Sequence, residues 1–327
     1  MKDSYGRTID YMRISITDRC NLRCRYCMPE GIEVIPMEDL LTFEEIVEVC
    51  TQAALLGIKK LKVTGGEPLV RRGAPSLIGM LKKIPGIEDV TLTTNGVFLK
   101  KYLNELLENG LRSVNISLDT RDEKVYQSIT GRDDFSMVME GIEAAVGAGM
   151  KVKINTVLLE QCNAEEWPGM LELARKYPVD VRFIEIMPIG MGRNYRGVSN
   201  SELIKKLKEK YPSMKKDDRI HGNGPAKYYT IPGFLGSVGV ISAMHGKFCD
   251  QCNRIRMSAQ GEIKPCLCYG NAVDVRKVLR SYEKKDVQRK EALCRVLEEA
   301  IIKKPQAHCF EKREEITENK KMVSIGG

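Results

Sequence analysis

The segment that decides the fold is Met12-Arg13-Ile14-Ser15-Ile16-Thr17-Asp18-Arg19-Cys20-Asn21-Leu22-Arg23-Cys24-Arg25-Tyr26-Cys27-Met28. Its first six residues alternate apolar and polar side chains, which is typical of a β-strand. Three cysteines follow in C-x-x-x-C-x-x-C spacing. They suit an iron–sulfur cluster better than zinc, because a closed zinc site takes four ligands. A four-iron cluster held by three cysteines leaves one iron open to a small molecule. A structural metal knuckle is the alternative.

A second segment, Gly65-Gly66-Glu67-Pro68, follows the apolar strand expected at residues 61–64. Two glycines after a strand allow a ligand to approach the backbone closely, or allow dihedral angles that other residues avoid. Alone this would be an ordinary turn. It lies one strand and one helix beyond the three cysteines, and that position makes it informative.

Together the two segments resemble the radical S-adenosylmethionine (SAM) enzymes. The resemblance implies that the open iron takes the amino and carboxylate groups of SAM, and that the Gly-Gly-Glu-Pro segment receives its ammonium. It also implies that an electron from the cluster cleaves SAM and releases a 5′-deoxyadenosyl radical.

Composition indicates a globular protein that keeps its cysteines reduced. The chain has 327 residues, 43% hydrophobic and 29% charged, which allows one large core or two domains. Its 11 cysteines are grouped, and no apolar run forms a signal peptide or membrane span, so we expect a cytoplasmic protein that uses thiols for metal. The net charge of +8 favours an anionic partner, either nucleic acid or a nucleoside triphosphate.

Strand-like and amphipathic helical stretches alternate up to about residue 187, which predicts parallel strands with helical crossovers. The strands are expected near residues 12–17, 60–64, 89–94, 113–118, 151–157 and 181–187. About six units are too few for a full barrel. The predicted fold is therefore α/β, a partial (open) parallel β/α barrel. We predict a barrel domain at 1–190 and a C-terminal region at 191–327 that closes the barrel mouth.

Polar residues occupy every second position in strand after strand. Because strand side chains alternate between faces, one polar set should line a hydrated lumen while the apolar set packs on helices. A sheet with one face in plain water is the alternative. The polar set comprises Arg13, Ser15, Thr17, Lys62, Thr64, Thr91, Thr93, Asn95, Asn115, Ser117, Asp119, Lys151, Lys153 and Asn155.

A second cysteine group lies at Cys249, Cys252 and Cys266, and Cys268 offers a fourth thiolate. Spacing alone leaves a zinc ribbon open. Arg254 and Arg256 come shortly after Cys252, two positions apart, and therefore share one side of an extended chain. The planar guanidinium group of arginine suits phosphate or purine acceptors.

With these residues the resemblance narrows to the GTP 3′,8-cyclases, the radical SAM lyases of molybdenum cofactor biosynthesis. It rests on residues 17–28, the Gly-Gly-Glu-Pro-Leu segment, residues 248–256 and the terminal Gly326-Gly327, and it covers essentially the whole chain. The resemblance implies two [4Fe–4S] clusters and SAM as cofactors, and GTP as substrate.

Site residues carry over by matching position. The clusters would be held by Cys20, Cys24, Cys27, Cys249, Cys252 and Cys266. SAM would contact Tyr26, Gly66, Ser117 and Met187. GTP would contact Arg13, Lys62, Thr93, Lys153, Arg254, Ile255 and Arg256. Catalysis would involve Arg13, Gly326 and Gly327. Lys62 departs from the family, which usually has arginine there, and Cys268 is not one of the family's cluster ligands.

The implied reaction abstracts hydrogen from ribose C3′ of GTP and joins that carbon to C8 of guanine, giving 3′,8-cyclo-7,8-dihydro-GTP. It would need an external one-electron reductant and a next enzyme that takes the product. The family is compatible with a homodimer and implies neither a nucleic acid nor a membrane partner. A radical SAM peptide-modifying enzyme would share the first two motifs but would not need the paired arginines. A zinc-dependent nucleic-acid-binding protein would group its aromatic and basic residues, whereas aromatics are 6% and dispersed.

Overall fold

The computed structural model describes residues 1–28, 35–283 and 287–325. Within these ranges the strands form one sheet in the order β12-β11-β10-β1-β2-β3-β4-β5-β6-β9-β8-β7. The strands are β1 (Tyr11–Ser15), β2 (Lys60–Thr64), β3 (Asp89–Thr94), β4 (Ser113–Ser117), β5 (Lys151–Thr156), β6 (Asp180–Ile184), β7 (Lys215–Asp217), β8 (Lys227–Thr230), β9 (Ser237–Ile241), β10 (Arg254–Met257), β11 (Glu262–Lys264) and β12 (Val273–Asp274).

The central part of this sheet is a parallel β/α barrel that is not closed by strand pairing. Strands β1 to β6 pair in parallel, as the sequence predicts, and the predicted α/β partial barrel is confirmed. Two further strands extend the parallel set, β10 beside β1 and β9 beside β6. Among the described strands, no pairing joins the two ends of the sheet. Both additional strands come from beyond residue 190, so the predicted C-terminal region contributes to the barrel wall.

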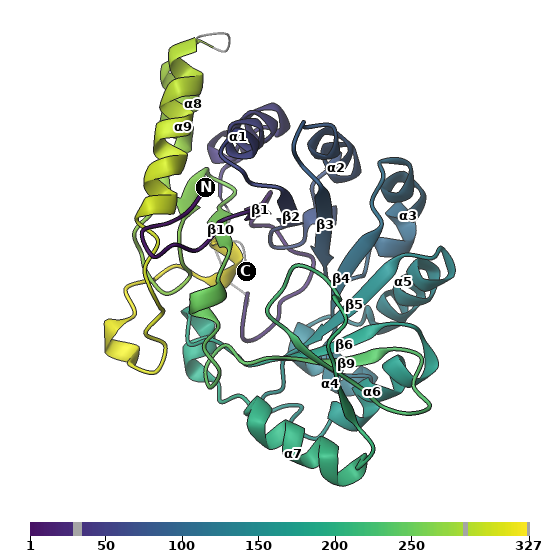
Figure 1. Cartoon of the computed structure of the whole chain (residues 1–327). Coiled ribbons are helices and arrows are strands. Elements are labelled where there is room, and N and C mark those ends of the chain that lie inside the picture. Colours follow the sequence, from purple (N-terminus) through teal and green to yellow (C-terminus); the bar gives the residue numbers. More distant parts are fainter. Residues whose placement is uncertain (29–34, 284–286, 326–327) are drawn as a thin grey trace.

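Helices cover the outside of the barrel (Figure 1). They are α1 (Phe43–Leu55), α2 (Ala74–Lys82), α3 (Leu99–Glu108), α4 (Glu123–Thr130), α5 (Phe135–Gly147), α6 (Trp167–Lys176) and α7 (Asn200–Lys210). The side chain of Thr42 accepts a hydrogen bond from Glu45 N–H, and the Glu45 side chain accepts one from Thr42 N–H, so α1 begins at the predicted capping box.

The strand register confirms the alternation predicted from the sequence. Arg13 lies opposite Lys62 on β2 and Arg256 on β10, while Asn115 lies opposite Thr93 and Lys153. Paired residues on neighbouring strands point to the same face, so polar side chains form a continuous inner surface. The intervening apolar residues are buried in the main core, as in Met12, Ile14, Leu61, Val63, Leu92, Ile116 and Ile154.

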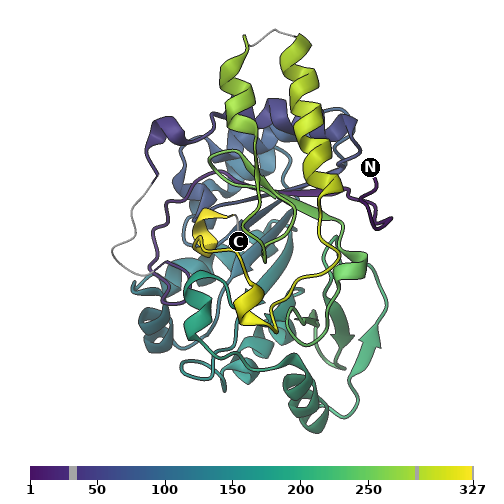
Figure 2. The same cartoon turned by 90° about the vertical axis from the view of Figure 1, so that its left-hand side faces the viewer.

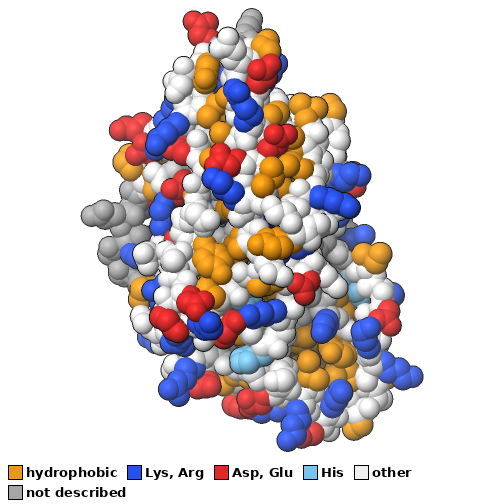
Figure 3. Space-filling view, turned by 60° about the vertical axis from the view of Figure 1, so that its left-hand side comes forward, with side chains coloured by type: hydrophobic (Ala, Val, Ile, Leu, Met, Phe, Trp, Pro, Cys, Tyr) orange, Lys and Arg blue, Asp and Glu red, His pale blue; other side chains and the backbone are white. Residues whose placement is uncertain are grey.

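The two helices α8 (Val275–Ser281) and α9 (Val287–Ile302) lie side by side and project away from the barrel next to α1 (Figures 1 and 2). Their base packs on α1 and the strands β11 and β12. Acidic and basic side chains are interspersed over the face shown in Figure 3. Within the described residues, no helix is long and apolar enough to cross a membrane.

Candidate active site

The first cysteine loop leaves the carboxyl end of β1 and is tied to the end of α4. Arg23 N–H donates to the Thr130 carbonyl at 2.7 Å and Arg25 N–H donates to the Ile129 carbonyl at 3.1 Å. The Leu22 N–H points at the Cys20 sulfur, 3.4 Å away. Backbone donors aimed at sulfur stabilise thiolate charge, which suits a metal ligand.

The electrostatics of these thiols fit a metal cluster. Burial raises the pKa of Cys20 and Cys24 and raises the pKa of Cys27 to about 12. The charges of the other cysteines raise the pKa values of Cys24 and Cys27 further. Three buried neighbouring thiolates therefore need positive charge to ionise together, and bound metal supplies that charge.

The Gly-Gly-Glu-Pro segment is held against the cysteine loop and β3. A Cβ atom on Gly66 would lie 2.3 Å from the Arg19 carbonyl oxygen, so close backbone approach requires glycine here. Neither Gly65 nor Gly66 has a positive φ, so unusual dihedral angles are not the reason for these glycines. The carboxylate of Glu67 is fully buried and ties this segment to β3. It accepts hydrogen bonds from Leu69 N–H, Thr94 Oγ1 and Asn95 N–H at 3.0, 2.8 and 2.6 Å.

The predicted SAM residues lie on the carboxyl-terminal side of the strands. Tyr26 donates from its hydroxyl to Asp119 at 2.6 Å, and burial raises the pKa of that carboxyl to about 6. Ser117 ends β4 with its side chain exposed, and Met187 follows β6 by three residues. The four residues thus come from segments that follow β1, β2, β4 and β6.

The second cysteine group lies at the opposite end of β1. Cys249 and Cys252 immediately precede β10, and the Asn253 carbonyl accepts from the Tyr11 N–H, where β1 begins. The five residues of β1 span roughly 16 Å at ~3.3 Å each, and the two groups lie beyond opposite ends of this strand.

The surroundings of this second group are cationic. Arg7 donates to the Cys249 carbonyl at 2.8 Å, and Lys304 donates to the Arg254 and Pro265 carbonyls at 2.8 and 2.7 Å. Burial raises the pKa of Cys252, but Lys304 and Arg254 outweigh it and leave the pKa at about 7. Within the described residues, no group of three or more Cys, His, Asp or Glu side chains is placed to hold a single metal ion. A cluster differs from zinc in this respect, since each thiolate binds a different iron.

Between the two cysteine groups, the inner surface gathers positive charge. Burial lowers the pKa of Arg13 to about 10 and the pKa of Lys153 to about 8. It also lowers the pKa values of Lys62 and Arg256 well below their ordinary range. Neighbouring cations contribute to each of these shifts. A set of mutually repelling buried cations indicates an anion-binding surface.

Of the remaining predicted substrate residues, Thr93 and Ile255 lie on opposite faces of the sheet, and an inner-face cation not predicted from the sequence, Arg182, lies on β6. Thr93 lies on the inner face and contacts the Asn115 amide, whereas Ile255 is fully buried with its side chain on the opposite face of β10 from Arg254 and Arg256. Arg182 on β6 was not predicted; it donates to Asn115 and Asn155 at 2.8 and 2.5 Å. The sequence signal was the same alternation, Asp180 then Arg182, in the sixth strand.

Cys268 lies in an apolar cluster against which Cys266 of the second cysteine group packs. The Cys268 sulfur is 3.2 Å from that of Cys309, in an apolar cluster with Ile189, Phe310 and Ile325. Gly326 and Gly327 lie outside the described residues, so their predicted role stays a prediction.

The fold and the site define a radical SAM protein. Residues 14–174 match the model of the Radical SAM superfamily, and residues 179–310 match that of Molybdenum Cofactor Synthesis C. The chain is 44% identical to a GTP 3′,8-cyclase of Clostridium perfringens and 43% identical to one of Petrotoga mobilis, with 100% of each chain covered. It therefore belongs to the GTP 3′,8-cyclase family. Membership of the radical SAM superfamily implies a [4Fe–4S] cluster and SAM.

Among solved structures, the chain is similar to Streptococcus suis SuiB bound to S-adenosylmethionine. The TM-score is 0.65 at 14% identity, and the alignment covers 96% of this chain and 77% of that one. At this identity the likeness concerns the fold.

Proposed function

We propose that this chain converts GTP to 3′,8-cyclo-7,8-dihydro-GTP with cleavage of SAM, an early step of molybdenum cofactor biosynthesis. The observation that carries the proposal is the cationic inner surface between two cysteine groups. A triphosphate carries several negative charges, and Arg13, Lys62, Arg254 and Arg256 are cations on that surface from three adjacent strands.

We propose that Cys20, Cys24 and Cys27 hold the SAM cluster. When bound, this cluster supplies the single electron that cleaves SAM and yields the hydrogen-abstracting 5′-deoxyadenosyl group. The chain's own residues bind and orient the reactants. Tyr26, Gly66, Ser117 and Met187 would surround SAM at the carboxyl ends of the strands, and the barrel wall would exclude water from the reacting carbon.

We further propose that Cys249, Cys252 and Cys266 hold a second [4Fe–4S] cluster with guanine on its open iron. The placement of the two cysteine groups at opposite ends of β1 supports this, since nucleotide and SAM must both fit between them. Arg254 and Arg256 follow Cys252 directly. They would orient the nucleotide beside this cluster, and Thr93 and Lys153 would contact it from β3 and β5.

Lys62 would contact phosphate as a point charge, because lysine lacks the planar fork of the family's usual arginine. Arg13 would act near the reacting ribose together with Gly326 and Gly327. The region 1–190 would hold SAM and share the GTP contacts with the region 191–327, which would hold the second cluster.

The test is anaerobic incubation of the iron-loaded protein with SAM, dithionite and GTP, followed by mass spectrometry. We expect 5′-deoxyadenosine and an isomer of GTP in equal amounts. SAM cleavage that GTP does not influence, with no GTP-derived product, would contradict the proposal. In the cell, an external one-electron reductant and an enzyme that consumes the cyclic nucleotide would be required. A cytoplasmic location and a homodimer are compatible with this function.

A further inference from the structure

A loop of the C-terminal region crosses the amino-terminal ends of the barrel strands. Residues 217–223, here called the floor loop, leave β7 and lead toward β8. Asn223 donates from its side-chain amide to Asp89, the first residue of β3, at 2.8 Å. The ring of His221 contacts Asp180, the first residue of β6. The floor loop is thus fixed to two strands that lie on different sides of β4 and β5.

The ring of His221 in the floor loop is held on both nitrogens and on one face. Its Nδ1 lies 3.0 Å from both carboxylate oxygens of Asp180, and its Nε2 lies 2.9 Å from Asp217. The ring also stacks on Tyr228, with centroids 3.9 Å apart and an interplanar angle of 11°. Contacts on both ring nitrogens and on the ring face fix the backbone of His221.

That backbone meets Lys153, the β5 residue on the cationic inner surface. The ammonium group of Lys153 donates to the His221 carbonyl. Gly222 permits this contact, because a Cβ atom there would lie 2.4 Å from the Lys153 nitrogen. The φ of Gly222 is +151°, within the range that favours glycine.

We propose that the floor loop is a positioning element, in which the His221 carbonyl aims the ammonium group of Lys153 at the phosphates of the substrate. This inference rests on the proposed function, because it takes GTP as the ligand of Lys153. An ammonium group has three N–H donors, so one can be held by the carbonyl while others meet an anion. Fixing a long side chain before binding lowers the entropy cost of ordering it.

The geometry also explains why the floor loop would act on binding rather than on SAM cleavage. The loop lies at the amino-terminal ends of β3 and β6, whereas the first cysteine loop follows the carboxyl end of β1. Lys153 lies opposite Asp180 in the β5–β6 register, and Asp180 holds the ring of His221. The lysine and the His221 contact are therefore at the same height along the barrel axis.

The experiment is a double-mutant cycle on GTP affinity, measured anaerobically by calorimetry on the iron-loaded protein. Gly222→Ala places a methyl group against the Lys153 nitrogen, and Lys153→Met removes that nitrogen. We expect each single variant to weaken GTP binding about ten- to hundredfold, the effect of one charge-assisted contact. The double variant should bind no more weakly than Lys153→Met alone, since both changes remove the same contact.

Gly224→Ala is the matched control, because a Cβ atom at Gly224 meets nothing within 4 Å. We expect its GTP affinity to equal that of the wild type. His221→Ala, which releases the ring clamp but keeps the carbonyl, is the second variant and should weaken binding through Lys153 as well. Iron content is measured for all variants, so that a loss of folding is recognised.

The outcomes separate this inference from the proposed function. Wild-type protein that does not bind GTP would contradict the proposed function itself. If the wild type binds GTP, the inference is overturned when Gly222→Ala binds GTP normally while Lys153→Met does not. It is also overturned when the two losses are additive, because the loop would then act independently of Lys153.

Discussion

Cys24 and Cys252 belong to cysteine groups at opposite ends of β1, so each can be replaced without touching the other group. Two four-iron clusters would give about eight irons per chain. We expect Cys24→Ala to halve the iron and abolish reductive SAM cleavage. Cys252→Ala should halve the iron as well but leave SAM cleavage measurable. Iron analysis and 5′-deoxyadenosine quantification check both, and a zinc ion in place of the second cluster would contradict the prediction.

Cys268 offers a control within the same segment. Its sulfur contacts that of Cys309 and is fully buried in the apolar cluster with Phe310. We therefore expect Cys268→Ser to retain full iron content and most of the cyclisation activity. Loss of half the iron in this variant would mean that a fourth thiolate closes the site that guanine needs.

Glu67 links stability to pH. Its carboxylate accepts from three donors, so Glu67→Gln would turn an amide N–H toward one of them and cost about 1–3 kcal/mol. Burial raises its pKa from 4.5 to about 7. The folded protein then holds a proton that the unfolded chain releases, and the stability contributed by Glu67 falls as pH rises from 4.5 to about 7. In anaerobic thermal melting, the melting temperature of the wild type should include a decrease across this pH window that Glu67→Gln lacks.

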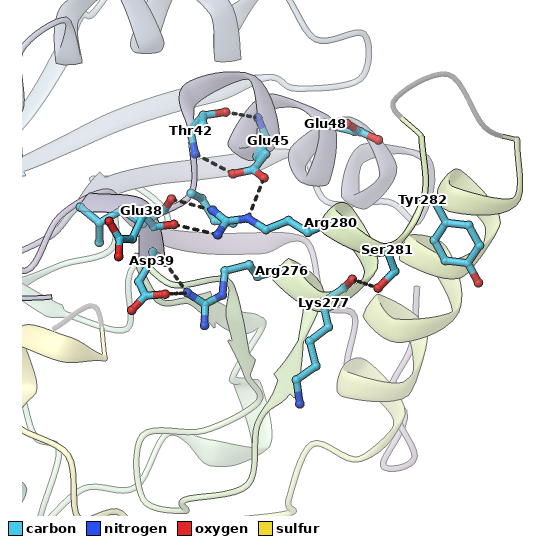
Figure 4. Close-up of polar contacts among 12 residues, drawn as sticks. Glu38, Asp39, Thr42, Glu45, Glu48, Arg276, Lys277, Arg280, Ser281 and Tyr282 are labelled. Carbon is cyan, nitrogen blue, oxygen red and sulfur yellow. Dashed lines mark hydrogen bonds and ion pairs between the residues drawn. The ribbon is translucent and has the colours of Figure 1, made fainter. Parts of the chain in front are cut away.

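Among the elements, helices α8 and α9 are attached to α1 and the segment before it by arginines (Figure 4). Arg276 pairs with Asp39 at 2.7 Å, and Arg280 donates to the Glu38 carbonyl at 2.7 Å and to Glu45 at 3.3 Å. These contacts are partly exposed, so the packing of α9 on α1 carries most of the attachment.

Among these arginines, Arg289 is the one whose substitution we expect to lower stability most. It pairs with Glu48 on α1 at 2.6 Å, and the two side chains are 5% and 15% exposed. Arg289→Met leaves a largely buried carboxylate without its partner, which should cost about 3 kcal/mol. Lys303→Met removes an exposed pair with Glu299 and should cost less than about 1 kcal/mol. Equal melting temperatures for the two variants would contradict this assignment.

The elements also set the limit of what sequence predicts. Strands β1 to β6 were predictable because each repeats the same local alternation before a helix. The extended conformation of residues 254–256 was predictable as well, but the pairing of β10 with β1 was not, since the paired residues are more than 240 positions apart and local pattern does not encode that contact. The inner-surface residues Arg13, Lys62 and Lys153 followed from the alternation. The floor loop did not, because polar residues between short strands indicate only a turn.

At the scale of the whole molecule, the net charge of +8 favours an anionic partner. In the structure, positive charge is concentrated on the inner face of the barrel. Charges of both signs are mixed on the face in Figure 3, while Arg13, Lys62, Lys153, Arg182 and Arg256 gather on the inner face. An anion that enters the barrel relieves the repulsion among them, so substrate binding should strengthen as ionic strength falls.

The last described residues of the chain pack beside the segment that follows β6. Ile325, the last described residue, is fully buried in the cluster with Ile189, and the backbone of Lys321 packs against Gly190. This fixes the tail beside the segment that follows β6, close to Met187. Gly326 and Gly327 follow directly, and two residues without side chains can enter a narrow channel and present a carboxylate to Arg13.

We expect deletion of Gly326 and Gly327 to leave folding, iron content and GTP affinity nearly intact, because Ile325 and the apolar cluster around it are retained. The deletion should nevertheless block hydrogen abstraction from C3′ and leave uncoupled SAM cleavage, since a carboxylate would be missing beside the ribose. Appending a third glycine is the matched control, because it keeps both glycines but displaces the carboxylate by about 3.5 Å. Mass spectrometry of the products, with GTP deuterated at C3′, follows the transfer into 5′-deoxyadenosine. A truncated enzyme that makes the cyclic nucleotide at the normal rate would mean that the tail has no part in the reaction.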